Sequence, residues 1–231
     1  MALQAIAANV AALGWGNGLL YSLGQILRRV SGGRVRLVRY LLVAQPVPAE
    51  VRPQCRPSAK NPVRPVAPSD PLVQQFPRPR HVIAQRFRDG STCLVAQSDE
   101  RFIGYLWLAR GAYDEDEVRC RYEFARPGES SWDYDVYVAP DFRIGRTLAR
   151  LWDASNAHLS RDGVRWTFSR ISAFNPGSLA AHGRFGTKVL HTASFLCLGG
   201  VQIAFIGAAP YLHLSLSDRS RPTLRLRPPA G

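Results

Sequence analysis

The sequence predicts an α/β fold: a mixed, mostly antiparallel sheet with one parallel strand pair and flanking helices. Several strand patterns separated by turns come first, and a strand–helix–strand order follows them. Short turns join antiparallel strands, whereas a helix between two strands implies a parallel crossover. The 231 residues are 46% apolar and 20% charged, which supplies a core and excludes wholesale disorder.

Two helices and a strand are expected at the N-terminal end. Apolar residues recur at helical spacing over residues 3–13 and 19–30, on either side of a Gly-Trp-Gly-Asn-Gly break. Gly-Gly at 32–33 ends the second helix, and the β-branched, leucine-rich segment 35–43 predicts a strand. We expect residues 1–44 to pack on or beside the core.

A proline- and arginine-rich stretch follows. Ten of the 17 prolines lie between residues 46 and 79, with few large apolar side chains among them. Such a composition disfavours a packed core or a regular element and favours extended polyproline conformations. We therefore expect residues 45–81 to form a linker or an arm on a surface.

Globular patterning resumes at residue 82. Strands are expected over residues 92–96, 102–109, 118–124, 132–138 and 164–173, with helices over 144–161 and from Asn175 to Arg184. Asparagine is a favoured helix cap, and proline suits the first helical position that follows it. Segments 187–198 and 201–206 are expected to pair around Gly199-Gly200. Residues 217–231 are expected to be a basic tail.

The net charge of +13 lies at the two ends of the chain. Residues 1–88 carry a surplus of 11 basic side chains, whereas residues 89–218 are nearly neutral. Nucleic acid is a poor match for these ends, because Phe76 is the sole aromatic residue of the proline-rich stretch. The N-terminal apolar stripes precede five arginines, so weak contact with an anionic membrane is an alternative to their docking on the sheet.

The cysteine spacing and the N-terminal residues bear on metal binding and location. The four cysteines have no metal-ligand spacing, so we expect no metal and no structural disulfide. The first charged residue is Arg28, which does not fit a secretory signal, and polar residues interrupt the apolar run. A cytoplasmic location is expected, with peripheral contact at the inner face of the membrane as an alternative.

The segment Val-Ala-Pro-Asp-Phe-Arg-Ile-Gly-Arg-Thr-Leu, residues 138–148, lies at a strand-to-helix junction. A helix N-terminus leaves amides unpaired and carries partial positive charge, so it suits a diphosphate. The candidate binding residues here are Tyr137, Val138, Arg143, Ile144, Gly145, Arg146 and Thr147. The alternative is an ordinary helix start that Asp141 caps.

A second motif, Asn-Pro-Gly-Ser-Leu-Ala-Ala-His-Gly-Arg-Phe-Gly, begins at Asn175. The two motifs, in this order and with these strands, resemble the GNAT superfamily of acyl-CoA-dependent N-acyltransferases over about residues 90–206. The resemblance implies that residues 82–216 form a GNAT-like acyltransferase domain with acyl-CoA, acetyl or longer, as cosubstrate. It also implies that Asn175 and Ser178 contact the cosubstrate, and that His182 replaces the family's proton-donating tyrosine.

Two aspartates are candidates for the general base. Asp133 and Asp135 alternate on the expected strand 132–138 and would share one face with Tyr137. A carboxylate there could take a proton from the amine, directly or through water. His182 could return a proton to the thiolate, because its ordinary pKa of about 6.5 lies near neutrality. Alternatively, the aspartates lie on a solvated strand face and His182 on a helix surface.

One departure from the family pattern leaves alternatives open. The loop before the helix is three residues shorter and keeps a single glycine, Gly145. One alternative is a long-chain acyl transferase that takes its donor from acyl carrier protein. Another is a non-catalytic GNAT-like scaffold that binds lipid or a partner through its arginine-rich ends. For the enzyme, a small-molecule or lipid-like amine acceptor is expected.

Overall fold

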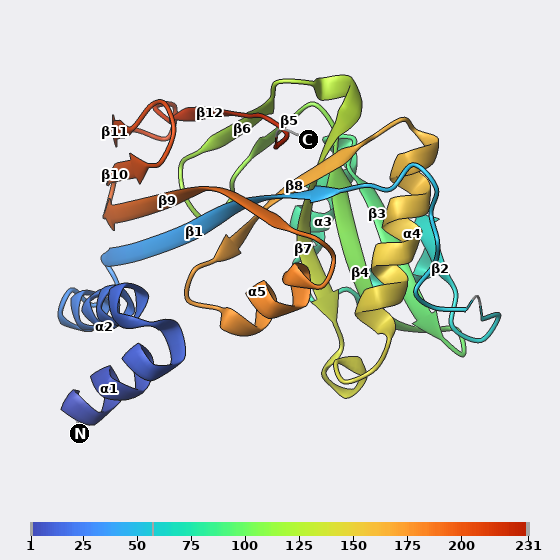
Figure 1. Cartoon of the computed structure of the whole chain (residues 1–231), viewed down its shortest axis with the longest axis horizontal. Helices are drawn as coiled ribbons and strands as arrows, with labels where there is room; N and C mark the ends of the chain where they lie inside the picture. Colours follow the sequence, from blue (N-terminus) through green and yellow to red (C-terminus); the bar gives the residue numbers. More distant parts are fainter. Residues whose placement is uncertain (1, 57, 230–231) are drawn as a thin grey trace. The chain divides into compact units, whose positions relative to one another are not determined.

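The computed structural model describes residues 2–56 and 58–229, and the chain divides into two compact units (Figure 1). The first unit comprises Met1–Gln45, Ala112–Ala125 and Phe168–Gly231, and the second comprises Pro46–Gly111 and Arg126–Thr167. Each unit contains both β-strands and helices.

In the first unit, antiparallel strands lie beside three helices. The helices are α1 (Ala2–Leu13), α2 (Trp15–Val30) and α5 (Pro176–Gly183). The strands follow the order β11 (Leu212–Ser215), β10 (Val201–Ile206), β9 (Lys188–Leu198), β1 (Val35–Pro46) and β8 (Trp166–Ser172), most of which lies in this unit. A smaller sheet has the order β12 (Thr223–Leu226), β6 (Arg121–Phe124) and β5 (Ala112–Asp114). Strands β6 and β12 pair in parallel.

The second unit is an antiparallel sheet with helical segments on its two faces. Its strands follow the order β7 (Ser130–Val138), β4 (Arg101–Ala109), β3 (Thr92–Ser98) and β2 (Val63–Val66). Helix α4 (Thr147–Arg161) packs against these strands. The remaining segments are α3 (Arg80–Arg88) and the 3-10 turns η1 (Pro71–Gln75), η2 (Pro127–Glu129) and η3 (Pro140–Phe142).

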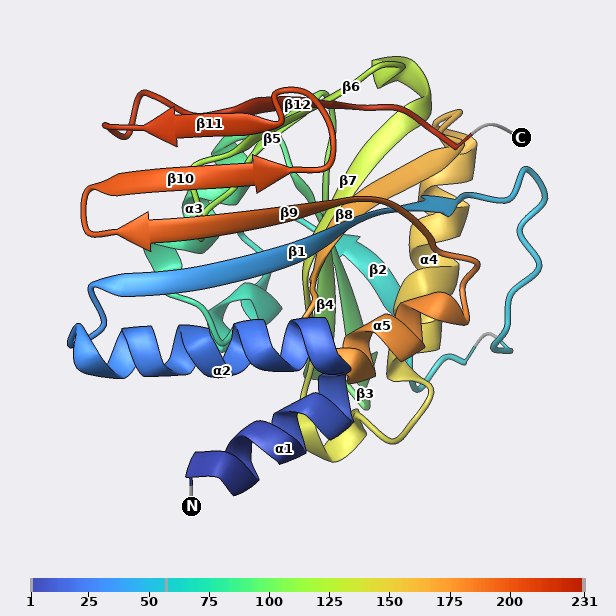
Figure 2. The same cartoon turned by 60° about the vertical axis from the view of Figure 1, so that its left-hand side comes forward.

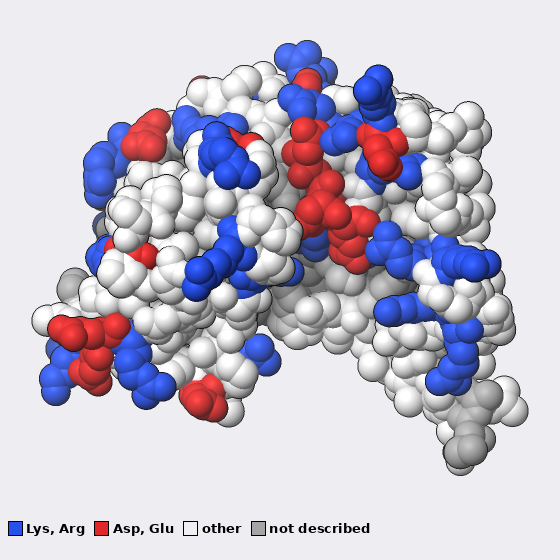
Figure 3. Space-filling model, turned by 180° about the vertical axis from the view of Figure 1, so that it is seen from behind, with Lys and Arg blue, Asp and Glu red and all other residues white. Residues whose placement is uncertain are grey.

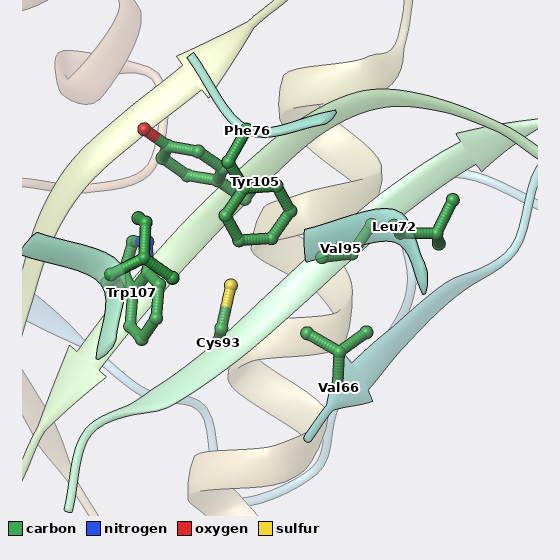
Figure 4. Packing of buried hydrophobic residues seen from close by; sticks show 8 residues of the cluster. Val66, Leu72, Phe76, Cys93, Val95, Tyr105 and Trp107 are labelled. Atoms are coloured by element: carbon green, nitrogen blue, oxygen red, sulfur yellow. The ribbon is translucent and has the colours of Figure 1, made fainter. Parts of the chain in front are cut away.

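The core of the second unit lies between η1, α3 and one face of β3 and β4. Phe76, Cys93, Val95, Tyr105 and Trp107 are buried together there, and Figure 4 shows their side chains pointing toward one another. The ring centroids of Phe76 and Tyr105 are 4.9 Å apart. Aromatic pairs at this separation add to the stabilisation that comes from burial of their apolar area.

The expectation that the proline-rich stretch contains no regular element is wrong. Strand β2 and turn η1 lie within it, and Val66 and Leu72 belong to the buried cluster. Two physical reasons make its prolines compatible with this order. β2 is the last strand of the series, where Pro65 need not donate to a further strand, and Pro71 begins η1.

The expected fold class, mixed α/β with a mostly antiparallel sheet and flanking helices, is confirmed. The predicted strands and helices are present, with shifted ends: α4 begins at Thr147 rather than at residue 144. The sequence analysis missed α3, β5, β11 and β12. Within the described residues, no helix is both long enough and apolar enough to cross a membrane.

The N-terminal helices form a pair, one of which contacts the sheet of the first unit (Figure 2). A Cβ added at Gly18 of α2 would lie 2.5 Å from the Cα of Val10, so only glycine permits this approach of α1 to α2. A Cβ at Gly24 would lie 3.3 Å from the Cβ of Leu37 on β1. The rings of Tyr21 and Phe174 are 5.3 Å apart. Helix α2 therefore docks on the sheet.

The four cysteines are free and buried. Cys55 and Cys93 belong to the second unit, and Cys120 and Cys197 belong to the first. Burial raises the pKa of Cys93 and Cys197, and it raises that of Cys120 to about 12. Cys93, Cys120 and Cys197 are therefore protonated at neutral pH and unreactive while they stay buried.

Candidate functional site

The candidate donor site lies in the second unit, where β7 ends. The N–H of Ala139 donates to the carbonyl oxygen of Ile103 at 2.8 Å, which continues the pairing of β7 with β4. Alternate residues of an antiparallel strand direct their N–H groups to the same neighbour. The N–H of Val138 therefore points away from β4, as an amide that binds a ligand at this strand end must do.

A β-bulge interrupts β7 at Asp135, whose φ of 45° lies in the left-handed region. Trp107 pairs with Tyr134 and Tyr105 with Tyr137, so β7 has one residue more than β4 over this interval. Tyr134 and Tyr137 therefore pack against the same cluster. The prediction that Asp133, Asp135 and Tyr137 share one face by strict alternation is wrong, because the bulge shifts the alternation.

The Asp135 carboxylate is held by three side chains. The Tyr105 hydroxyl and the Arg78 Nε donate to it at 3.0 and 3.1 Å, and Arg86 contributes a further short ion pair. Burial by itself would raise the pKa of Asp135, but the hydrogen bonds from the two arginines outweigh it and hold the pKa below its ordinary value. A carboxylate with these partners is a weak base, which favours a structural role. Its catalytic role stays a prediction.

Asp133 lies in a different environment. It pairs in register with Leu108, and 3% of the residue is exposed. The bulge thus separates two aspartates that the sequence analysis expected to act from one face. Asp133 stays a predicted proton acceptor.

The loop after β7 leads into α4 without a side-chain cap. Arg143 donates from Nε to the Val138 carbonyl at 3.1 Å, and Arg146 is the N-cap residue. The first backbone hydrogen bond of the helix is donated by the N–H of Arg150 and accepted at 2.9 Å by the carbonyl oxygen of Arg146, the residue before α4. In the described part of the chain, the N–H groups at 147–149 have no hydrogen-bond acceptor. The alternative that Asp141 caps the helix is wrong, because Asp141 lies inside η3.

This loop is presented to solvent. Arg143, Ile144, Gly145 and Arg146 are all exposed, and Ile144 has a relative exposure of 103%. Thr147 is buried at the first position of α4. Free helical amides and guanidinium groups are hydrogen-bond donors that suit phosphate oxygens. The residues present therefore fit the diphosphate of a CoA thioester.

Gly104 on β4 permits the close packing beside this strand end. A Cβ added there would lie 2.6 Å from the carbonyl oxygen of Tyr137. We expect Gly104→Ala to lower the free energy of unfolding by about 2 kcal/mol, because β4 and β7 must separate. Urea denaturation measures the change. Gly128→Ala, where a Cβ meets nothing within 4 Å, is the control. Equal stability of the two variants would contradict the expectation.

The second predicted motif lies in the first unit. Asn175 caps α5, where its Oδ1 accepts the N–H of Ser178 at 3.0 Å, as the sequence predicted. His182 lies in the last turn of α5 and is half-buried. Burial lowers the pKa of His182 to about 4. Its imidazole is therefore neutral at pH 7, and the reason for expecting an imidazolium proton donor no longer holds.

The structure places the predicted residues in two groups. Asp133, Asp135, Tyr137, Val138 and the loop 143–147 belong to the second unit, whereas Asn175, Ser178 and His182 belong to the first. The sequence analysis missed Arg78 and Arg86, because no local pattern links either arginine to an aspartate some fifty residues away. Among the described residues, no group of three or more His, Cys, Asp or Glu could hold a metal ion.

No family model matches the chain, and no curated protein matches it in sequence. Similar solved structures include a protein from Novosphingobium aromaticivorans assigned to the GNAT acetyltransferases, with 14% identity and a TM-score of 0.48. The match covers 69% of this chain and 63% of that one. A GNAT family acetyltransferase from Elizabethkingia anophelis with acetyl-CoA bound has 14% identity and a TM-score of 0.41, with coverages of 55% and 76%.

Proposed function

We propose that the chain is an N-acyltransferase that moves an acyl group, acetyl or longer, from a CoA thioester to an amine. The observation that carries this proposal is the uncapped start of α4, which follows β7 and η3 along the chain and is preceded by the exposed Arg143 and Arg146. Free amides and two guanidinium groups there would bind the diphosphate of coenzyme A. The GNAT-like motifs at residues 138–148 and 175–186 support the same donor.

The chemistry is direct attack in a ternary complex. The amine nitrogen attacks the thioester carbonyl carbon, the carbon–sulfur bond breaks, and the nitrogen loses one proton. The N–H of Val138 would hydrogen-bond to the carbonyl oxygen as negative charge develops on it. Asp133 would accept the amine proton, directly or through water. The resemblance to the GNAT pattern assigns the sulfur to His182, whose neutral imidazole would donate a hydrogen bond to it as it departs. The acceptor is a small-molecule or lipid-like amine.

The donor site predicts a specific loss of binding. Arg143→Ala and Arg146→Ala should each weaken acetyl-CoA binding about tenfold, because each removes a charge-assisted contact to phosphate. Titration calorimetry measures the dissociation constants. Arg161→Ala, an exposed arginine in the last turn of the same helix, is the matched control and should leave binding unchanged.

Calorimetry on the wild-type chain decides between the donors. Absence of binding to both acetyl-CoA and a longer acyl-CoA would contradict the proposal. It would favour an acyl carrier protein as the donor, or a non-catalytic scaffold. Equal losses in the Arg161 control and in the loop variants would show that general charge, rather than the α4 start, binds the nucleotide.

A further inference from the structure

The sheet of the first unit has apolar side chains on both faces. On one face Phe195, Ala204 and Ser215 are buried. On the other face Phe205 pairs in register with Leu212, and both are more than half exposed, at 55% and 63%. An antiparallel sheet with one solvated face ordinarily carries polar residues there. This outer face is therefore apolar and exposed.

Helix α2 adds an exposed apolar stripe to the same surface. Leu19, Leu23, Ile26 and Val30 follow helical spacing and are 47–76% exposed. Helix α2, which carries the stripe, lies against the outer sheet face, because a Cβ added at Gly24 would lie 3.3 Å from the Cβ of Leu37, which pairs with Leu196 (Figure 2). We call the two together the apolar face: Leu19, Leu23, Ile26 and Val30 of α2 with Leu198, Phe205, Leu212 and Leu214 of the sheet.

The segments that form the apolar face contain basic but no acidic residues. Residues 1–49 and 163–217, which include every residue of this face, contain no Asp or Glu. Among the described residues, Arg28, Arg29 and Arg39 have no carboxylate partner. In Figure 3, which views the chain from behind, the visible side of α1 and α2 at the lower right shows basic and uncharged side chains and no acidic ones.

We propose that the apolar face binds the surface of a lipid bilayer that contains anionic lipids. Its leucines would contact the acyl boundary, and the unpaired arginines would contact lipid phosphates. Trp15 and Tyr211, exposed at 76% and 71%, are the amphipathic aromatic residues that favour the headgroup region. A second copy of the chain fits less well, because it would bring two sets of unpaired arginines together.

Co-sedimentation of the full chain with vesicles tests this surface. Vesicles of phosphatidylcholine with about a third phosphatidylserine should bind the chain, and phosphatidylcholine alone should bind it weakly. Binding should fall as salt rises from about 0.1 M to about 0.5 M, because screening weakens attraction to the headgroups. Wild-type chain that stays in the supernatant with anionic vesicles at low salt would overturn the proposal.

Variants separate the apolar contribution from the charge contribution. Leu212→Glu with Leu214→Glu should abolish vesicle binding while circular dichroism shows an unchanged fold, since both side chains are already solvated. Arg28→Ser with Arg29→Ser should weaken it about 25-fold, at about fivefold for each arginine. Arg52→Ser with Arg80→Ser, at arginines that are also exposed but lie outside the face, is the control with the same charge change.

Two further results would overturn the proposal. The first is an equal loss of binding in the control and in the Arg28 and Arg29 variant, which would mean that net charge alone recruits the chain. The second is a dimer in light scattering that dissociates on Leu212→Glu with Leu214→Glu, together with no vesicle binding by the wild type. The apolar face would then be an interface between copies.

Discussion

Replacing Asp135 by asparagine is expected to lower the free energy of unfolding by about 3 kcal/mol. Its carboxylate balances Arg86 and Arg78, and the side chains of Asp135 and Arg86 are 13% and 9% exposed. Loss of the negative charge leaves a nearly buried guanidinium without its counter-charge, which is strongly destabilising. Guanidinium chloride denaturation, followed by circular dichroism, measures the difference.

The pH dependence of stability gives a second readout of the same ion pairs. The pKa of Asp135 is lowered in the folded chain, so the stabilisation is fully present above the ordinary carboxyl pKa. It is lost as the pH falls through the lowered value. The asparagine variant should lack this part of the acid sensitivity.

The control for Asp135 is Asp114→Asn. Asp114 pairs with Arg121 with both side chains exposed, at 47% and 39%, and such pairs contribute less than about 1 kcal/mol. If Asp135→Asn instead kept full stability and lost acyl transfer, the carboxylate would be a general base and the structural role would be wrong.

His182→Ala is expected to lower the turnover number about a hundredfold, with little change in donor affinity, because a donor to the departing sulfur acts mainly in the transition state. The pKa of His182 is lowered to about 4, so wild-type turnover should show no ionisation near pH 6.5. Steady-state kinetics across the neutral pH range, with chemistry shown to be rate-limiting, measures both effects.

The pH dependence of the free energy of unfolding tests the lowered pKa of His182 independently of activity. The unfolded chain takes up a proton at the ordinary pKa of 6.5, whereas the folded chain does so near 4, so stability falls as the pH drops between these values. His182→Ala should reduce this fall. His81→Ala, at an exposed position of α3, is the control. A wild-type kinetic pKa near 6.5 that disappears in His182→Ala would show that His182 titrates as a solvated imidazole.

Short sequence motifs predicted the ends of those helices and strands that depend on a few neighbouring residues. Asn175 followed by Pro176 predicted the cap and first turn of α5, and the structure shows that hydrogen bond. The alternating strand 132–138 was predicted in place, but its bulge was not. The left-handed φ of Asp135 accompanies hydrogen bonds from arginines distant in the sequence, which no period-two pattern contains.

The strand-to-helix junction shows the same limit at the candidate site. Residues 138–148 were correctly placed at a turn into a helix, but η3 occupies Pro140–Phe142 and delays α4 to Thr147. Periodicity does not separate a 3-10 turn from the first helical turn, because both suit the same residues. The amides of Leu148 and Ala149 therefore join the candidate site although the sequence analysis did not name Ala149.

Each unit contains two buried cysteine thiols, whose chemical labelling would report the unfolding of that unit. Cys55 and Cys93 in one unit, and Cys120 and Cys197 in the other, are shielded from alkylating reagents while the fold is closed. Iodoacetamide would label them only during transient opening, at a rate set by the free energy of that opening. Peptide mass spectrometry of the labelled chain would then show whether the two units open together or one before the other.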